Sequence, residues 1–268
     1  MIPPPCGRPV WITGDCSVLL LCAATGRELA AALGKLAPEG LAEARDERPP
    51  RPFAVRLRQG PALACTTGVG PINAAMTLGV VLASASAART PVTAALNLGL
   101  AGAFDLDDMP LRTHCAVVKE IWPEYGLHDG RSVVAAAFGF PQWDRPAAEG
   151  GSVRDCISLA DPDIPPPVEM PQGWKAGPLP DAPRVSAVTV AGVSASTARA
   201  RQLRDTYPGV AVESMEGFAV AYVCARYGIP CWQWRTVSNK AGPRAAHEKD
   251  FPGALRALGE LLPAFNLL

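Results

Sequence analysis

The sequence has no surplus of charge and few aromatic residues. Its 268 residues include 25 Lys+Arg and 25 Asp+Glu, giving a formal net charge of +0 at pH 7, and aromatic residues make up 6% of the chain. A general nucleic-acid-binding protein needs a basic surplus for its phosphate contacts, and adsorption to an anionic membrane surface needs clustered basic residues. The charge balance therefore argues against both kinds of partner.

Long hydrophobic runs and paired cysteine motifs are also missing. No run reaches the ~18 to 20 apolar residues that a membrane span requires, and the proline-rich residues 1–16 lack the cationic start of a signal peptide. The 8 cysteines show no C-x-x-C spacing, and most lie in apolar runs, where a thiol behaves as a small buried hydrophobe. We expect a cytoplasmic protein with reduced thiols. No metal is predicted either, because no metal-ligand spacing joins His114, His128 and His247.

The chain does show apolar strands alternating with helical patterns. With 49% hydrophobic residues it can bury a core without covalent cross-links. Short apolar runs predict strands, and apolar residues at helical spacing predict helices. The alternation predicts one α/β domain with a mostly parallel sheet covered by helices. The expected strands are 18–24, 53–58, 62–66, 92–98, 114–120, 184–191 and 230–238, and the expected helices are 27–36, 71–87, 196–207, 213–227 and 252–265.

Two segments depart from this pattern. Residues 1–17 are expected to form a loose N-terminal extension, and residues 18–268 a single domain. Within that domain, ten prolines between positions 141 and 183 prevent regular structure over most of the segment. We interpret it as a long surface insertion, with a functional lid as the alternative.

Ligands of such sheets bind at the carboxyl ends of strands, so turns after apolar runs are the candidate sites. Four segments qualify, namely 24–28, 66–70, 97–103 and 238–242. Gly68 and Gly70 precede an expected helix, as in a dinucleotide site, but the third glycine and the acidic residue about 20 positions on are missing. We therefore predict no dinucleotide and no other cofactor.

Glu213 and Glu216 lie three residues apart at the expected start of an otherwise apolar helix. The helix dipole alone stabilises acidic residues there. Gly217 and Ala219, however, give this helix small side chains and favour its burial, and a buried carboxylate needs partners, such as two hydroxyls of a ligand. The residues alone leave both interpretations open.

Several motifs together resemble those of the nucleoside phosphorylase and nucleosidase superfamily. They are 67–70, 97–102, Glu213-Ser-Met-Glu-Gly217 and Arg235-Thr-Val-Ser-Asn239, in the expected order. Within the superfamily the chain is most similar to the futalosine hydrolases, because of segments 117–126 and 238–244. The resemblance covers about residues 18–262. It implies a single-domain phosphorylase/hydrolase-like fold with a central twisted mixed sheet flanked by helices.

The resemblance implies a cofactor-free enzyme that hydrolyses the N-glycosidic bond of futalosine and releases hypoxanthine. Such a reaction needs an activated water, hydrogen bonds to the ribose hydroxyls and stabilisation of the negative charge on the departing base. By the same match Glu28 is the general base, Glu216 accepts hydrogen bonds from the ribose hydroxyls, and Glu213 is structural. Further substrate-binding positions are implied at Thr67, Gly68, Gly99, Val193 and Met215. Core packing is the alternative for Val193 and Met215, and an exposed helix acid the alternative for Glu28.

Asn239 is the residue expected to contact the purine. Adenosine-cleaving relatives have an aspartic acid at this position, which can donate to N7 and accept from a 6-amino group. The asparagine NH₂ can instead donate to N7 or to a 6-oxo oxygen. This favours hypoxanthine over adenine; the alternative is an asparagine that bonds its own turn.

Three other functions remain open. In a phosphorylase Arg27 would hold phosphate, although Glu28 beside it repels an anion. A methylthioadenosine or aminodeoxyfutalosine nucleosidase is disfavoured by Asn239. A nucleoside-binding protein without turnover has no use for Glu28 together with Glu216.

The resemblance further implies a homo-oligomer, a dimer or larger, with a small-molecule nucleoside as its substrate. The 5′ carboxyphenyl arm of futalosine should need an aromatic wall and a cation. The spacing does not choose among Trp122, Tyr125, Arg131 and Arg244.

Overall fold

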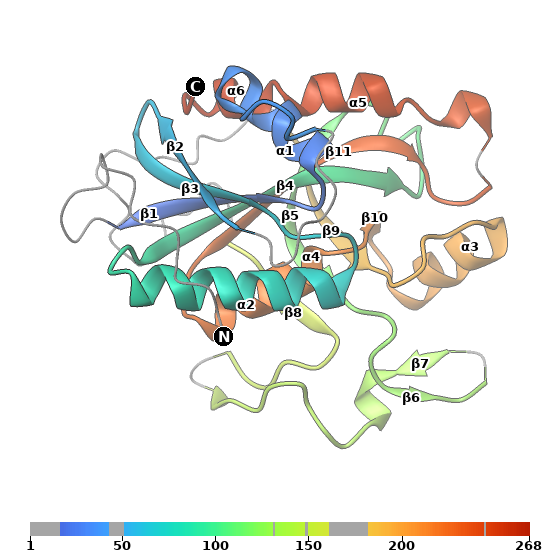
Figure 1. Cartoon of the computed structure of the whole chain (residues 1–268). Coiled ribbons are helices and arrows are strands. Elements are labelled where there is room, and N and C mark those ends of the chain that lie inside the picture. The colour runs from blue at the N-terminus through green and yellow to red at the C-terminus, as the bar shows by residue number, and fades with distance from the viewer. Residues whose placement is uncertain (1–16, 43–50, 131, 148–149, 161–181, 244) are drawn as a thin grey trace.

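A nine-stranded mixed sheet lies at the centre of the structure (Figure 1). The computed structural model describes residues 17–42, 51–130, 132–147, 150–160, 182–243 and 245–268. The strand order is β10-β9-β5-β11-β4-β1-β3-β2, with β8 paired to β5. Five pairs are parallel (β1 with β3 and β4, β11 with β4, β9 with β5 and β10), and four are antiparallel. The expected mixed α/β sheet is confirmed.

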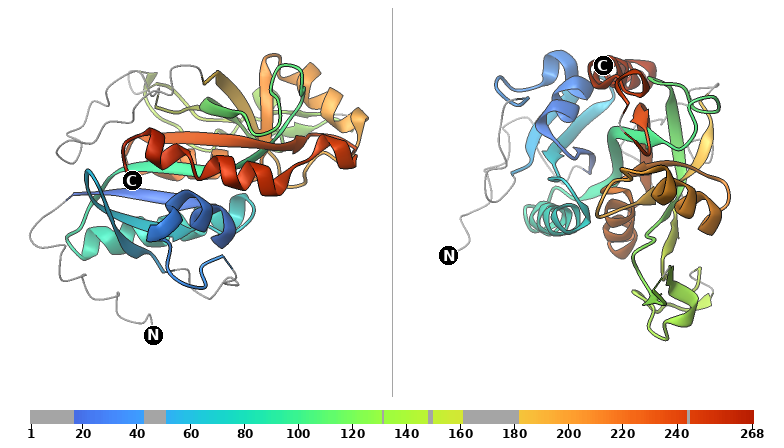
Figure 2. Two further views of the ribbon diagram at one scale, coloured as in Figure 1. Left: turned by 90° about the horizontal axis from the view of Figure 1, so that it is seen from above. Right: turned by 90° about the vertical axis from the view of Figure 1, so that its right-hand side faces the viewer.

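The strands follow the apolar runs of the sequence. They are β1 (Val18–Ala23), β2 (Phe53–Leu57), β3 (Gly60–Thr66), β4 (Val92–Ala103), β5 (His114–Ile121), β8 (Cys156–Ser158), β9 (Arg184–Thr189), β10 (Val210–Ser214) and β11 (Cys231–Lys240). The two short strands β6 (Leu127–His128) and β7 (Val133–Val134) form a separate hairpin that projects away from the sheet (Figures 1 and 2).

Six α-helices are described: α1 (Gly26–Leu33), α2 (Pro71–Ala87), α3 (Thr197–Thr206), α4 (Gly217–Arg226), α5 (Phe251–Leu258) and α6 (Leu261–Ala264). Helix α2 has the predicted bounds, with Pro71 in its first turn, where a missing N–H is harmless. The expected final helix 252–265 is divided into α5 and α6. Pro263 cannot donate to the carbonyl of Gly259, so one continuous helix through this point is not favoured.

Helices cover both faces of the sheet. Leu19 and Leu21 of β1 pack in one core with α1, α5 and α6, whereas Leu20 and Cys22 pack in another with α2 and α4. Figures 1 and 2 show these two helical layers on opposite sides of the sheet. Because successive side chains of a strand point to opposite faces, burial on both sides requires the continuous apolar run seen in β1.

Two expected turns are parts of strands. Segment 97–103 belongs to β4, and residues 238–240 belong to β11. The glycines of β4 do not end the strand because β11 pairs with residues 95–103 and β10 pairs with the last two residues of β4. Gly99 is therefore a strand residue, and the prediction of a turn there was wrong.

The expected helix 213–227 begins later than predicted. Residues 210–214 form β10, and α4 begins only at Gly217. β10 pairs in parallel with β9 and also joins β4, where Glu213 lies opposite Gly102. Glu213 is thus a strand residue and not a helix acid. Through this double pairing the sheet curls, so that the end of β10 comes beside the end of β4.

Part of the proline-rich insertion joins the sheet. β8 pairs with β5, and Trp143 forms an isolated bridge with Val153. Residues 161–181 of the insertion, and residues 1–16 of the expected N-terminal extension, lie outside the described residues. In the part of the chain that is described, no helix has the length and apolar character to cross a membrane.

Candidate active site

Glu28 lies in the first turn of α1, and its carboxylate bridges that helix to β4. Glu28 Oε2 accepts hydrogen bonds from Thr25 N–H at 3.0 Å and from the Thr25 hydroxyl at 2.7 Å. The Thr25 hydroxyl oxygen in turn accepts from Glu28 N–H, so the two residues form a capping box at the start of α1. Oε1 accepts from Leu100 N–H at 2.9 Å. A carboxylate has about four acceptor positions, so Glu28 keeps capacity for a donor such as water.

Glu216 occupies the junction between β10 and α4. Its side chain is buried, and Oε1 accepts from Gly70 N–H at 2.9 Å. Gly70 has φ +91°, a conformation that favours glycine and directs this N–H toward the carboxylate. Burial raises the pKa of Glu216, and the nearby Glu28 charge raises it further, whereas the Gly70 hydrogen bond and Arg235 lower it.

Arg235 of β11 lies beside both carboxylates. Its side chain is 2% exposed, and Nε and Nη2 have no hydrogen-bond partner among the described residues. Gly99 makes room for it, because a Cβ at Gly99 would come within 2.6 Å of Arg235 Nη1 and 3.0 Å of Glu28 Oε1. The positive charge of this buried guanidinium favours the ionised form of Glu216.

Glu120 is a further buried carboxyl group close to this cluster. It lies on β5 with 0% exposure, and a Cβ at Gly217 would come within 1.9 Å of Glu120 Oε1. Burial raises the pKa of Glu120 to about 7, against the opposing effects of Arg235 and of hydrogen bonds from Thr189 and Gln233. The sequence analysis did not identify Glu120 or Arg235 as site residues. The feature that could have identified each of them is a charged residue inside an apolar strand.

Asn239 lies at the end of β11, beside a second glycine of β4. A Cβ at Gly102 would come within 3.0 Å of Asn239 Nδ2. Nδ2 donates to Lys240 O at 2.8 Å, and Oδ1 accepts from the Ser238 hydroxyl at 2.9 Å. The amide therefore bonds its own strand end, as the structural alternative expects, but its second N–H hydrogen is still available to a ligand.

Val193 lies in the connection between β9 and α3, and Glu213 holds this connection in place. Glu213 accepts from Ser194 N–H at 3.0 Å and from the Ser194 hydroxyl at 2.7 Å. Val193 is 36% exposed, so it is not a core residue. Because Glu213 also lies opposite Gly102, the loop that carries Val193 is tied to the same end of β4 as Asn239.

The glycine-bearing loop after β3 packs against the end of β1. Thr67 N–H donates to Ala23 O at 2.8 Å, and Gly68 N–H donates to Ala24 O at 3.0 Å. The Thr67 side chain is buried, and among the described residues its hydroxyl lies within hydrogen-bond distance of backbone carbonyls only. The Thr67 hydroxyl thus faces the protein interior. Met215, another predicted site residue, is half-buried and directly precedes Glu216 in the chain.

The predicted residues therefore form two groups along β4. Glu28 and Arg235 lie at Gly99, and Glu216 interacts electrostatically with both, whereas Asn239 and Val193 belong to the Gly102 end. Gly99 and Gly102 are three positions apart in the strand, which corresponds to roughly 10 Å. Arg131 and Arg244, two of the expected cations for a 5′ arm, lie outside the described residues.

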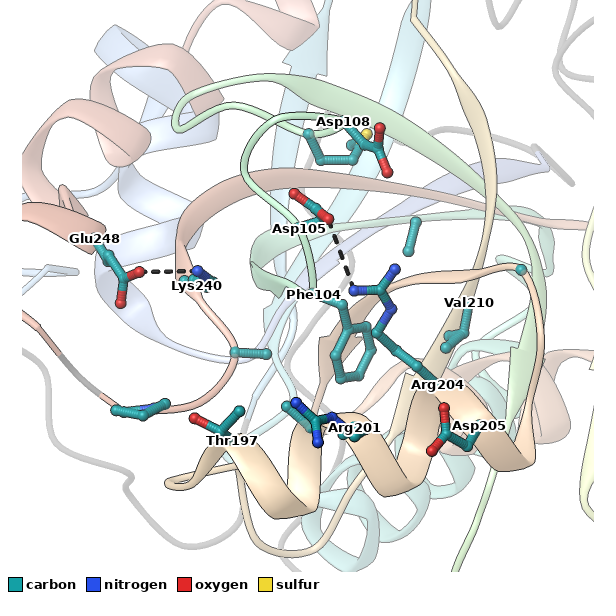
Figure 3. Close-up of a pocket in the computed structure, with 16 residues that line it drawn as sticks. Phe104, Asp105, Asp108, Thr197, Arg201, Arg204, Asp205, Val210, Lys240 and Glu248 are labelled. Carbon is teal, nitrogen blue, oxygen red and sulfur yellow. Dashed lines mark hydrogen bonds and ion pairs between the residues drawn. The ribbon is translucent and has the colours of Figure 1, made fainter.

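A cavity of about 780 Å³ lies next to this region but contains none of the predicted site residues (Figure 3). Lys240 lines it, and because successive strand residues point to opposite faces, the Asn239 side chain points elsewhere. Its charged groups are largely paired with one another, Arg204 with Asp105 at 3.7 Å and Lys240 with Glu248 at 2.9 Å. The predicted chemistry therefore does not belong to this cavity.

Comparison with known proteins gives relatives of one kind. A futalosine hydrolase of Acidothermus cellulolyticus is 41% identical over 79 residues, which are 30% of this chain and 32% of that protein. A futalosine hydrolase of Thermus thermophilus is 32% identical over 179 residues, 66% of this chain and 69% of that protein. The chain thus spans only about a third of the length of the first relative.

Solved structures agree on the fold. A 5′-methylthioadenosine/S-adenosylhomocysteine nucleosidase of Helicobacter pylori, solved with butyl-thio-DADMe-Immucillin-A, superposes with a TM-score of 0.66 at 14% identity, covering 93% of this chain and 97% of that one. The model of the phosphorylase superfamily matches residues 19–262. This chain belongs to the phosphorylase superfamily.

Proposed function

We propose that the protein is a nucleosidase that hydrolyses the N-glycosidic bond of futalosine and releases hypoxanthine. The observation that carries the proposal is that Glu28 and the buried Arg235 meet at Gly99 while the Glu216 carboxylate interacts electrostatically with both. The names of the two curated relatives support futalosine as the substrate. Such a reaction requires an activated water beside a cationic sugar, and two carboxylates meet this requirement.

In this mechanism Glu28 removes a proton from the attacking water. Three donors from Thr25 and Leu100 fix the orientation of its carboxylate. The water would lie within hydrogen-bond distance of Glu28, on the side where Arg235 Nη1 also lies.

Glu216 accepts hydrogen bonds from the ribose hydroxyls in this scheme. A carboxylate that is mostly shielded from water interacts strongly with the positive charge that develops on the sugar. Its bond from Gly70 fixes one oxygen, leaving the other for the substrate. Gly68, Thr67 and Met215 would border the sugar through backbone and apolar contacts.

Asn239 and Val193 would form the base pocket at the Gly102 end of β4. The free hydrogen of Asn239 Nδ2 can bond to N7 or to the 6-oxo oxygen of hypoxanthine. The amide cannot act as a general acid, so the leaving base is stabilised by hydrogen bonding. A 6-oxopurine preference follows from this assignment.

We expect Asn239→Asp to shift the preference between hypoxanthine and adenine nucleosides by about 10- to 100-fold toward adenine. The reason is that a protonated aspartic acid donates to N7 while its second oxygen accepts from the 6-amino group, and one mismatched buried polar group costs about 1–3 kcal/mol. The ratio of kcat/KM for the two nucleosides measures the shift. Asn266→Asp, at the distant C-terminal end, serves as the control. An unchanged ratio in Asn239→Asp would contradict the assigned base contact.

The proposed function is tested by measuring hypoxanthine release from futalosine, first in phosphate-free buffer and then with phosphate added. Release without phosphate, and without cleavage of inosine, supports the hydrolase. Phosphate-dependent release with formation of a sugar 1-phosphate would identify a phosphorylase with Arg27 in the site. Binding of the nucleoside without release would identify a binding protein.

A methylthioadenosine nucleosidase is the second candidate function, because the structurally similar Helicobacter pylori protein is a nucleosidase of this kind. It predicts release of adenine from methylthioadenosine. Separate assays with methylthioadenosine and futalosine discriminate between the two.

An aromatic cluster offers a wall for the 5′ arm of futalosine. Trp122 and Tyr125 are stacked with their ring centroids 6.0 Å apart, and Trp122 also contacts Phe218 at 5.7 Å. Phe218 follows Gly217 in the first turn of α4, two residues beyond Glu216. We therefore prefer Trp122 and Tyr125 among the expected candidates for this arm.

We also propose a cytoplasmic homo-oligomer. Helix α2 presents Ile72, 82% exposed, Met76, 58% exposed, and Val80 at helical spacing. A row of exposed apolar side chains of this kind fits a second copy of the chain. Light scattering of the purified protein is expected to give at least twice the chain mass of 28.0 kDa, and Met76→Lys should lower that value. A monomer in the unsubstituted protein would contradict this proposal.

A further inference from the structure

A row of polar side chains crosses the sheet beneath α4. Five neighbouring strands contribute one residue each, and both ends of the row lie within the protein: Thr189 of β9, Glu120 of β5, Gln233 of β11, Asn97 of β4 and Cys22 of β1. Buried polar groups cost free energy unless they are hydrogen-bonded, so such a row needs an explanation.

Every hydrogen bond of the row is directed toward Glu120. From one side the Cys22 thiol donates to Asn97, Asn97 Nδ2 donates to Gln233 at 2.8 Å, and Gln233 Nε2 donates to Glu120 Oε1. From the other side the Thr189 hydroxyl donates to Glu120 Oε2 at 2.8 Å. An ionised carboxylate only accepts, so it satisfies both chains of donors, whereas a neutral carboxyl group brings an O–H that conflicts with one of them.

The Thr189 hydroxyl connects Glu120 to the active-site helix. Because its hydrogen is donated to Glu120, its oxygen is free to accept from Phe218 N–H, at 2.6 Å, in the first turn of α4. The N-cap residue of this helix, Glu216, makes no capping hydrogen bond with its side chain, which bonds to Gly70 instead. Thr189 therefore supplies the cap that Glu216 does not, and Gly217 allows Glu120 to approach the helix.

We propose that Glu120 is a positioning residue: in its ionised form it orients the Thr189 hydroxyl, which anchors the first turn of α4 and so fixes the Glu216 carboxylate for binding ribose. This inference rests on the proposed nucleosidase function.

The charged and titratable groups that face Glu120 determine how it responds to pH. Arg235 of β11 favours its ionised form, Glu216 at the start of α4 opposes it, and the Cys115 thiol of β5 also interacts with it. Burial raises the pKa of Cys115 to about 12, so this thiol stays neutral. With the pKa of Glu120 raised to about 7, mainly by burial, the ionised fraction changes across neutral pH.

We expect kcat/KM for the nucleoside to rise about tenfold from pH 6 to pH 8, as a single group with a pKa near 7 ionises. Glu120→Gln should remove this rise, and the loss should appear mainly in KM, because Glu216 holds the ribose. Glu124→Gln is the matched control: Glu124 is a half-buried carboxyl group with a raised pKa, but it pairs with Arg199 at 3.0 Å, away from the row. A folded Glu120→Gln variant that keeps the wild-type pH profile would overturn the proposal.

Thr189 provides a second test that does not change a charge. Thr189→Val removes the hydroxyl with little change in volume and should raise KM as Glu120→Gln does. Thr189→Ser keeps the hydroxyl and should restore the wild-type KM. Equal KM values in the Val and Ser variants would exclude the action through Thr189.

Thermal denaturation separates this inference from the proposed function, because it needs no substrate. The folded-state pKa of Glu120 is raised above the unfolded value of 4.5. Its contribution to stability is therefore complete below about pH 4.5 and is lost as the pH rises toward about 7. The Tm of wild type relative to that of Glu120→Gln should fall over this interval. If the protein cleaves no nucleoside but the Tm difference between wild type and Glu120→Gln still changes with pH, only the proposed function is rejected. If that Tm difference is the same at every pH, the titration of Glu120 is rejected.

Discussion

Replacing Glu28 with glutamine is expected to lower kcat by about 10²- to 10⁴-fold, the usual contribution of a general base. An amide cannot remove a proton from water, although the carbonyl oxygen of the substituted side chain can still accept one of the bonds from Thr25 or Leu100. KM should change little, because in the proposed mechanism Glu28 acts on the water and not on the ribose. Steady-state rates of hypoxanthine release from futalosine measure both parameters.

Two further measurements make this result interpretable. Glu39→Gln alters an exposed carboxylate in the segment that follows α1 and should leave kcat unchanged. Because Glu28 belongs to the capping box of α1, the Tm of Glu28→Gln should also be measured, and a fall corresponding to about 0.5–2 kcal/mol is expected from the weakened cap. A kcat within threefold of wild type in the folded variant would show that another group is the base.

Gly217→Ala should strongly destabilise the protein and abolish most of its activity. The added Cβ would lie 1.9 Å from Glu120 Oε1 and 2.7 Å from Gln233 Nε2. Glu120 cannot swing aside easily, because it is fully buried and hydrogen-bonded through both oxygens. Overpacking of a well-packed interior costs about 1–3 kcal/mol, and here the helix that carries Glu216 must also shift. Urea denaturation measures the loss of stability.

Gly79→Ala is the matched control for this substitution. Gly79 is also a helical glycine, but a Cβ there would meet no atom within 4 Å. Alanine is favoured over glycine in a helix by about 0.5–1 kcal/mol, so this variant should be more stable than wild type. If both variants change the free energy of unfolding in the same direction, the collision with Glu120 does not govern the behaviour of Gly217.

Local sequence patterns predicted most elements of the fold, including α2 and the buried strand β1. The errors concern elements whose partners are distant in the chain. Segment 97–103 contains two glycines and is predicted to be a turn, yet β4 continues through it because β11 and β10 hydrogen-bond to it. β10 was missed because its short apolar segment 210–212 directly precedes the helix expected at 213–227, and only the pairing with β9 and β4 identifies residues 210–214 as a strand.

The candidate site was predictable only in part. Family motifs pointed to Glu28, Glu216 and Asn239, but the partners of these residues depend on tertiary contacts. Nothing near Arg235 in the chain indicates that it meets Glu28 beside Gly99, and nothing near Glu120 indicates that it lies under Gly217. A charged residue in an apolar strand reveals burial, but it does not reveal which strands supply its neighbours.

The place of β11 in the sheet has a consequence for how the protein is made. β11 comes last among the strands, yet it inserts between β4 and β5, which are synthesised roughly a hundred residues or more earlier. Until residue 240 has left the ribosome, these two strands have an open gap between them and expose unpaired edges. Such edges are sites of wrong pairing and aggregation, and closing them requires contacts of high sequence separation, which form slowly. Chains that stop before β11 should therefore depend on chaperones, whatever the stability of the completed fold.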